Sequence, residues 1–409
     1  MQLRIDANAI MQAALASALP DNAVCAALDQ ADFGTGKLVL VAAGKAAWQM
    51  AKAAADRLGE RINSGVVVTK YNHSKGEIFP FTIYEAGHPV PDKNSFRATQ
   101  AAIDAVSDLQ PEDTVLFLLS GGGSALFEKP LIPEENLNRL TKELLACGAD
   151  IVEMNTVRKR FSAVKGGRFA EICQPAKVFT IVLSDVLGDK LDMIASGPAY
   201  PDSSTAEDAK AIVRKYNLTL TAQMKELLEQ ETPKTLDNVE THITGSVRQL
   251  CAAAEAACRH LGYEPVVLTD QLTCVARDAG VFLSSIAKTH AGSGRKLAYL
   301  AGGETVVHLT GHGKGGRNQE IALAAAEGIA GLDACVFSLG SDGTDGPTDA
   351  AGGITDGTTC RVLKDMGIII SDVLQDNDAY NALAKCDGLI MTGPTGTNVN
   401  DISVLLIGG

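Results

Sequence analysis

The chain has 409 residues, of which 46% are hydrophobic and 21% charged, and its formal net charge is −13. This length favours two domains, and the composition is typical of globular proteins. The acidic balance argues against nucleic acid or an anionic membrane as a partner, although local amides and cations can still bind a small anion. We expect a cytoplasmic protein. No apolar run is long enough to span a membrane, the nine cysteines never form C-x-x-C, and the N-terminal stretch is unlike a signal peptide.

Short apolar runs alternate with helical patterns along the chain, which predicts α/β layers over a largely parallel sheet. In the first series we expect strands at 37–42, 65–69, 82–86, 114–119 and 178–183, and helices at 46–58, 95–109 and 134–147. A polar helical stretch at 201–237 follows, and we place the domain boundary in it or just after it. In the second series we expect strands at 241–245, 264–268, 296–301, 334–340 and 403–407, and helices at 247–261, 274–291 and 318–328.

The most specific motif is a glycine-rich turn after the strand at 114–119, formed by Ser120, Gly121, Gly122, Gly123 and Ser124. Glycine permits positive φ, so several N–H groups can point at one anion, and a helix that starts here would add its dipole. A tight turn without a ligand is the alternative. Three glycines and two hydroxyls exceed what such a turn needs, so we predict phosphate binding.

A second turn, Gly44-Lys45, follows the first strand and opens a helix. A lysine in this place puts a cation beside amides that already favour anions, which suits a phosphoryl group in transfer. A solvated first-turn lysine is the alternative, but a cation is disfavoured at a helix N-terminus. No Walker A loop and no dinucleotide fingerprint after a strand accompanies these turns.

The second series carries its own glycines and charges. Glu304 follows a strand that ends in two glycines, and Arg317 follows the glycine-rich stretch 311–316. The guanidinium fork of Arg317 suits phosphate or carboxylate oxygens, while a glycine-rich hairpin without a ligand is the alternative for 311–316.

Acidic residues mark two further loops. Asp342 and Asp345 lie in a turn-rich stretch with two other aspartates; most of these form turns, and one or two are expected to contact Mg²⁺ or substrate. Asp189, after the strand at 178–183, can accept a proton in phosphoryl transfer, and helix capping is an equal alternative. Near the C-terminus, Thr395 and Asn398 offer hydrogen-bonding groups in a loop.

Together these motifs resemble the glycerate 2-kinases of the MOFRL type, the glycerate kinase type II family. The likeness is collinear over nearly the whole chain and rests on long segments: AAGKAAWQMA, GHPVPDKNS, LLSGGGSAL, EMNTVRKRFSAVKGGR, VLSDVLGDKLDMIASGP, AGGETVV with GKGGRNQE, GSDGTDGPTDAAG and GPTGTNVND.

The resemblance implies a Rossmann-like, three-layer α/β/α domain, here residues 1–237, and a smaller C-terminal α/β MOFRL domain, here residues 238–409. The family's reaction is the phosphorylation of D-glycerate to 2-phosphoglycerate with ATP and Mg²⁺, in a cleft between the two domains. Two alternatives stay open: a hydroxypyruvate or tartronate semialdehyde reductase that uses NAD(P)H, and a phosphosugar-binding protein without catalytic activity. A homodimer is common for enzymes of this size.

Carried over residue by residue, the resemblance assigns the site. Lys45, Asp189 and Arg317 would be catalytic. His88 and Arg160, with Arg317, would contact the substrate, although structural roles for the first two are equally open. From their residue type, and not from the resemblance, Asp342 and Asp345 are expected to bind the metal. The expected ATP-binding residues are Gly44, Ser120, Gly121, Gly122, Gly123, Ser124, Glu304, Thr395 and Asn398.

Overall fold

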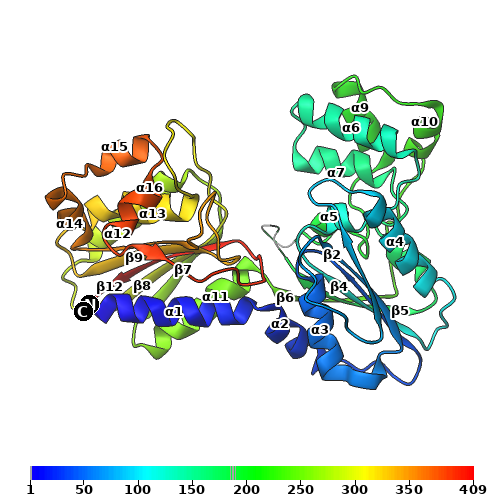
Figure 1. The fold of residues 1–409 in the computed structure, drawn as a ribbon, viewed down its shortest axis with the longest axis horizontal. Coiled ribbons are helices and arrows are strands. Elements are labelled where there is room, and N and C mark those ends of the chain that lie inside the picture. Colours follow the sequence, from blue (N-terminus) through cyan, green and yellow to red (C-terminus); the bar gives the residue numbers. More distant parts are fainter. Residues whose placement is uncertain (1, 185, 187, 189) are drawn as a thin grey trace. The chain divides into compact units, whose positions relative to one another are not determined.

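Two six-stranded sheets, each in its own unit, organise the chain (Figure 1). The computed structural model describes residues 2–184, 186, 188 and 190–409. The parallel-sheet unit comprises Ala23–Leu183 and Asp189–Thr244, and the mixed-sheet unit comprises Met1–Asn22, Ser184–Gly188 and Gly245–Gly409. The two-domain α/β prediction is therefore confirmed.

The parallel sheet has the strand order β3-β2-β1-β4-β5-β6, the order of doubly wound nucleotide-binding folds. All pairs from β3 to β5 are parallel. Every residue of β1 and β4 is buried, because helices cover both faces of the sheet. The strands are β1 (Leu38–Ala43), β2 (Ser64–Lys70), β3 (Phe81–Ala86), β4 (Thr114–Leu119), β5 (Lys177–Leu183) and β6 (Val239–Gly245).

Alternate residues of each strand point to opposite helical layers. Leu116 joins the core formed with α2 and α3, whereas Phe117 packs against Phe127 and Phe169 on the other face. Helices α6, α7, α9 and α10 form a further group with its own core (Figure 1). The helices are α2 (Pro20–Leu28), α3 (Ala47–Leu58), η1 (Gly59–Arg61), α4 (Lys93–Val106), α5 (Gly123–Leu126), α6 (Glu134–Ala146), α7 (Ile151–Lys159), α8 (Arg168–Ile172), η2 (Ile194–Ser196), α9 (Ala206–Lys215) and α10 (Ala222–Leu228).

The polar stretch at 201–237 is helical, as expected, but it lies wholly within the parallel-sheet unit, and the division between the units falls after it. Its helices α9 and α10 pack on α6 and α7, and the chain then adds β6 to the parallel sheet beside β5. A cut between 237 and 238 would remove β6 from its sheet, and the contacts divide the chain after Thr244 instead.

The second sheet has the strand order β11-β10-β9-β12-β8-β7. Among its described pairs only β7 and β8 are parallel, because the C-terminal strand β12 inserts antiparallel between β8 and β9. The prediction of a largely parallel sheet is therefore wrong for this unit. Helices cover both faces here too, so antiparallel strands show the same unbroken apolar runs. The strands are β7 (Glu264–Leu272), β8 (Leu297–Gly303), β9 (Ala334–Gly340), β10 (Gly352–Asp356), β11 (Leu389–Ile390) and β12 (Asp401–Ile407).

Helices α1 and α11 cover one face of the mixed sheet, and α12 and α13 cover the other. The N-terminal helix α1 contributes Ala7, Ile10, Met11, Ala14 and Ala18, whose helical spacing forms one apolar stripe. The helices are α1 (Gln2–Ala18), α11 (Val247–His260), α12 (Ala276–His290), α13 (Arg317–Gly328), α14 (Thr359–Asp365), α15 (Ile370–Gln375) and α16 (Ala379–Ala384).

Polar contacts fix α1 to residues far away in the sequence. The buried Tyr263 hydroxyl donates to the buried Asp6 carboxylate at 2.7 Å, and Arg4 binds Asp356 and the carbonyl of Asp387. Burial, followed by the hydrogen bond to Asp6, raises the pKa of Tyr263, so this hydroxyl stays protonated and donates.

Replacement of Tyr263 by Phe should lower the free energy of unfolding by about 1–3 kcal/mol, because it leaves a buried carboxylate with one donor fewer. Urea unfolding measures this change. The matched control is Tyr380→Phe, which removes an exposed tyrosine–aspartate hydrogen bond of the same 2.7 Å length in the same unit and should have little effect. Equal losses in both variants would contradict the tethering role of Asp6.

Candidate functional site

The loops after β1 and β4 meet at the carboxyl edge of the parallel sheet. These strands are neighbours, with Ala43 opposite Leu119. The Lys45 amide donates to the Gly121 carbonyl at 2.8 Å, and the Ala46 amide donates to the Ser120 hydroxyl at 3.1 Å. The order of strands reverses between β1 and β4, and at such a point α/β sheets bind their ligands.

Two glycines are required where these loops approach each other. Gly44 has φ +133°, and a Cβ there would lie 2.1 Å from the Ser120 hydroxyl. Gly122 has φ +85°, and its Cβ would lie 3.0 Å from the His88 ring and 3.2 Å from Cγ of Lys45. The side-chain stem of Lys45, the His88 imidazole and the Gly122 backbone are therefore neighbours.

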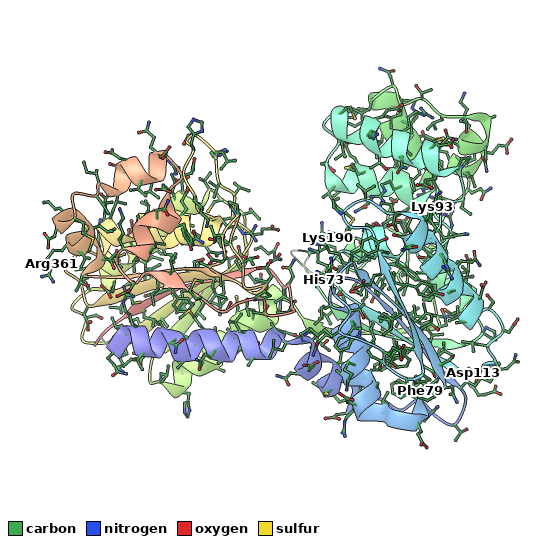
Figure 2. All side chains as sticks on the ribbon, in the orientation of Figure 1. His73, Phe79, Lys93, Asp113, Lys190 and Arg361 are labelled. Atoms are coloured by element: carbon green, nitrogen blue, oxygen red, sulfur yellow. The ribbon has the colours of Figure 1, made fainter. Side chains whose placement is uncertain are left out.

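Lys45 and His88 determine the charge at this point. Burial, and then the nearby charge of Lys45, lower the pKa of His88, so its imidazole is neutral at pH 7. Among the described residues, no carboxylate lies within ion-pair distance of Lys45. His73 contacts the same loop, with its Nδ1 3.2 Å from the Lys45 carbonyl. Figure 2 shows His73 at the opposite end of the strands from Asp113, which directly precedes β4.

A buried lysine holds the glycine-rich turn through hydrogen bonds to its backbone carbonyls. Ser120–Ser124 leads into α5, a single helical turn rather than a long helix. The fully buried Lys165 donates to the carbonyls of Ser124 at 2.8 Å and Phe127 at 3.1 Å, and its ammonium lies 3.1 Å from Glu128. Burial lowers the pKa of Lys165, while Glu128 opposes this shift.

The Ser124 hydroxyl is already bound within the protein. Ser196 donates to Oδ1 of Asn155 at 3.0 Å, so in the 2.9 Å contact between the two serine hydroxyls Ser124 is the donor. The supporting turn is strained: Ala195 and Ser196 have φ of +50° and +62° without being glycine. Ser124 can therefore offer an anion its amide, while its hydroxyl proton is used to hold the loop.

Arg160 lies in the interior of the parallel-sheet unit. Its side chain is 0% exposed and donates to the carbonyls of Gln230 and Ser204 and to Glu231 at 3.0 Å. These contacts favour the structural one of the two roles that the sequence left open. Asp189 lies outside the described residues.

In the mixed-sheet unit, Arg317 is held by two carboxylates. Its Nη2 donates to Asp401 at 3.0 Å, its Nε donates to the same carboxylate, and its Nη1 donates to Glu304 at 3.0 Å. Burial lowers the pKa of Arg317, but the hydrogen bonds and charge of Asp401 outweigh it and raise this pKa. Its side chain is still 33% exposed, so part of the guanidinium faces solvent.

The two expected metal ligands have other contacts. Asp345 is buried and accepts hydrogen bonds from the backbone N–H groups of Asn318 at 3.2 Å and Gln319 at 2.8 Å. Its carboxylate therefore binds the N-terminal turn of α13, although Asp345 is not part of that helix. Burial raises the pKa of Asp345 to about 6, although the hydrogen bonds from these two amides act to lower it. One oxygen of Asp342 accepts the Thr344 amide in a local turn. Within the described part of the chain, no three acidic, histidine or cysteine side chains group as a metal site.

The remaining expected ATP contacts lie in the same unit. Thr395 donates its amide to the Asp342 carbonyl and its hydroxyl to the Ser341 carbonyl, so the loop containing Thr395 and the half-buried Asn398 lies on the loop after β9. Exposed Glu304 borders a pocket of about 900 Å³, which Arg317 and the glycine-rich stretch 311–316 also line.

The sequence interpretation missed three supporting side chains. Asp401 orients Arg317, Lys165 holds the α5 turn, and Ser196 binds Ser124. All three stand inside the segments that carry the family resemblance, but neither their spacing nor their residue type shows which distant group they contact.

The comparisons with known proteins agree with this architecture. A family model described as a domain of unknown function, DUF4147, matches residues 6–229, and the MOFRL family model matches residues 297–401. The chain is 53% identical to a D-glycerate 2-kinase of Thermotoga maritima, with 97% of each chain covered. It is also 41% identical to a putative hydroxypyruvate reductase of Agrobacterium vitis, which covers 91% of this chain and 100% of that protein.

A crystal structure of glycerate kinase from Thermotoga maritima superposes with a TM-score of 0.95 at 51% identity, covering 99% of both chains. None of the described helices combines the length and the apolar character that a membrane span needs. Fold, family models and full-length identity lead to one conclusion: this chain belongs to the glycerate 2-kinase family, with a DUF4147 region followed by a MOFRL domain.

Proposed function

We propose that this chain transfers the γ-phosphoryl group of ATP to the 2-hydroxyl of D-glycerate, giving 2-phosphoglycerate and ADP. The observation that carries the proposal is the meeting of Lys45 with the glycine-rich turn at the switch point of the parallel sheet. The relatives named as glycerate 2-kinases support the same reaction.

Lys45 and the turn supply the positive side of the site. The ammonium of Lys45 has no ion-pair partner among the described residues, and its neighbour His88 is neutral, so its charge is available to a phosphoryl oxygen. The amides of Gly121, Gly122 and Ser124 add dipoles that are fixed in place before the substrate arrives, whereas the Gly123 amide donates to the Ser120 carbonyl. Phosphoryl transfer needs this kind of positioning and charge neutralisation more than covalent chemistry.

Arg317 supplies a cation that is already oriented. Asp401 and Glu304 occupy three of its five N–H donors, which leaves two for a carboxylate or phosphoryl oxygen. Holding the guanidinium in place reduces the side-chain entropy that is lost when the substrate binds. We assign Arg317 to the carboxylate of glycerate or to the transferring group.

The acid–base and metal roles follow from residue type. Asp189 is our candidate for orienting or deprotonating the 2-hydroxyl. For Mg²⁺ the aspartates fit unequally, because both oxygens of Asp345 accept helix amides, whereas no described hydrogen bond reaches Oδ2 of Asp342. Asp342 is therefore the better candidate to hold the ion, which would neutralise charge on the nucleotide phosphates.

Two further features remain proposals. We place the protein in the cytoplasm, because all nine cysteines are unpaired thiols, which suits a reducing compartment. We also expect a homodimer.

Lys45→Ala should reduce kcat by about 100- to 1,000-fold, because a preorganised cation at the transferring group is lost. A coupled assay for ADP with D-glycerate measures this effect, and thermal unfolding should change little. The control is Lys52→Ala, which removes an exposed lysine of α3 that pairs with Asp56. Near wild-type turnover in Lys45→Ala would exclude Lys45 from the mechanism.

Gly122→Ala should abolish most activity, because the added methyl group would press on His88 and Lys45 at a residue with φ +85°. Gly148→Ala is a matched control, since Gly148 has φ +75° but nothing within 4 Å of the added Cβ. Both variants should lose about 1–2 kcal/mol of stability from the left-handed backbone. Only Gly122→Ala should lose turnover; equal activities would refute the role of this turn.

Substrate choice separates the kinase from the reductase. With D-glycerate and Mg-ATP the chain should form ADP, and with hydroxypyruvate and NADH or NADPH it should leave the absorbance at 340 nm (the nicotinamide band) unchanged. Oxidation of NAD(P)H without ADP formation would overturn the proposed function.

A further inference from the structure

The pocket of about 900 Å³ is lined by residues of the mixed-sheet unit alone. D-glycerate has three carbons and is polar throughout, so it needs only a small part of this volume and no apolar wall. The pocket is of the size and character of those that hold larger, partly apolar ligands. Of the two substrates in the proposed reaction, only the nucleotide has such a part.

One wall of the pocket is apolar and exposed. Val306 is 49% exposed and Leu309 is 84% exposed, and Pro347 is also part of the lining. When a flat aromatic ring covers apolar side chains that are in contact with water, binding is favourable because apolar surface is removed from water. A purine base presents such a ring.

The polar groups of the lining include several acceptors. Glu320 is buried and accepts from Arg277 at 3.1 Å and from Asn377 at 3.4 Å. The hydroxyl of Thr305, a residue 4% exposed, has no hydrogen-bond partner among the described residues. Carboxylates and hydroxyls suit the hydroxyls of a ribose and the amino group of a base.

Residues 311–314 of the glycine-rich stretch do not form a phosphate nest. Asn377 accepts the amides of Thr310 and Gly311, and the Asp376 carbonyl accepts the amide of Gly313 at 2.8 Å. Asp376 and Asp378 accept the amides of the residues on either side. These donors are used within the protein, and the carboxylates of Glu304 and Glu320 would repel a polyphosphate inside the pocket.

We propose that this pocket binds the base and ribose of the phosphoryl donor, with the base on Val306 and Leu309 and the polyphosphate leading out past Arg317. The proposal rests on the proposed kinase function, and it names the part of the nucleotide that the mixed-sheet unit recognises. It assigns residues 311–314 of the glycine-rich stretch to shaping the pocket rather than to holding phosphate.

AMP binding to the full-length protein, measured by isothermal titration calorimetry, tests the proposal without any phosphoryl transfer. Val306→Asp should weaken AMP binding about tenfold or more, because the base would have to desolvate a carboxylate. The matched control, Val281→Asp, changes a valine that is 54% exposed in the same unit and lies outside the pocket lining, so it should bind AMP like wild type. In turnover, Val306→Asp should raise KM for ATP and leave KM for D-glycerate within about twofold.

Thr305→Val, which keeps the side-chain shape, is a second variant and should weaken AMP binding without a change in folding. Wild-type AMP affinity in Val306→Asp, equal losses in Val281→Asp, or no AMP binding by the wild-type protein would overturn the proposal. AMP binding that Val306→Asp weakens, in a protein that forms no ADP with D-glycerate, would support the pocket and count against the kinase function instead.

Discussion

The close approach of two loops between β1 and β4 is the constraint on which the candidate site depends. The strands are adjacent, parallel and fully buried, so their carboxyl ends must open at the same edge. Only glycine fits at position 44, because its Cα faces the Ser120 hydroxyl. That single steric condition sets the path of the chain into α3 and brings the stem of Lys45 to the glycine-rich turn.

The two units hold their candidate anion-binding groups, the glycine-rich turn and the Arg317 guanidinium, by different means. In the parallel-sheet unit the support is applied to the glycine-rich turn, where Lys165 binds the backbone carbonyl of Ser124 and Ser196 accepts from the Ser124 hydroxyl. In the mixed-sheet unit the support is applied to the side chain, since Asp401 and Glu304 hold the Arg317 guanidinium directly. Both arrangements place positive charge in a fixed geometry, and preorganised charge stabilises a transition state better than mobile charge does.

Much of this architecture could be predicted from the sequence. Apolar runs located the main strands to within a few residues, and glycine clusters located the loops after β1, β4 and β8. Pairing partners could not be predicted, because a strand covered on both faces has the same pattern whether its neighbours are parallel or antiparallel. For the same reason nothing in the sequence of β6 assigns it to the first sheet, and nothing in β12 places it between β8 and β9.

Side-chain roles were harder to predict than strands. Arg160 has the residue type of a substrate ligand, and only its complete burial shows that its donors are used inside the protein. Asp345 likewise has the chemistry of a metal ligand, but the amides of α13 occupy its carboxylate. In both cases the deciding partner lies at least 26 residues away in the sequence, beyond any local motif.

The position of α1 also has a consequence for biosynthesis. This helix packs in the core of the mixed-sheet unit with α11 and β9, whose residues emerge from the ribosome more than 200 positions later. A nascent chain therefore holds an amphipathic helix with its apolar stripe uncovered while the whole parallel-sheet unit is being translated, and such a stripe is a natural binding site for a chaperone. The protein cannot mature strictly from one end to the other, because its first helix packs against the sheet whose strands are synthesised last.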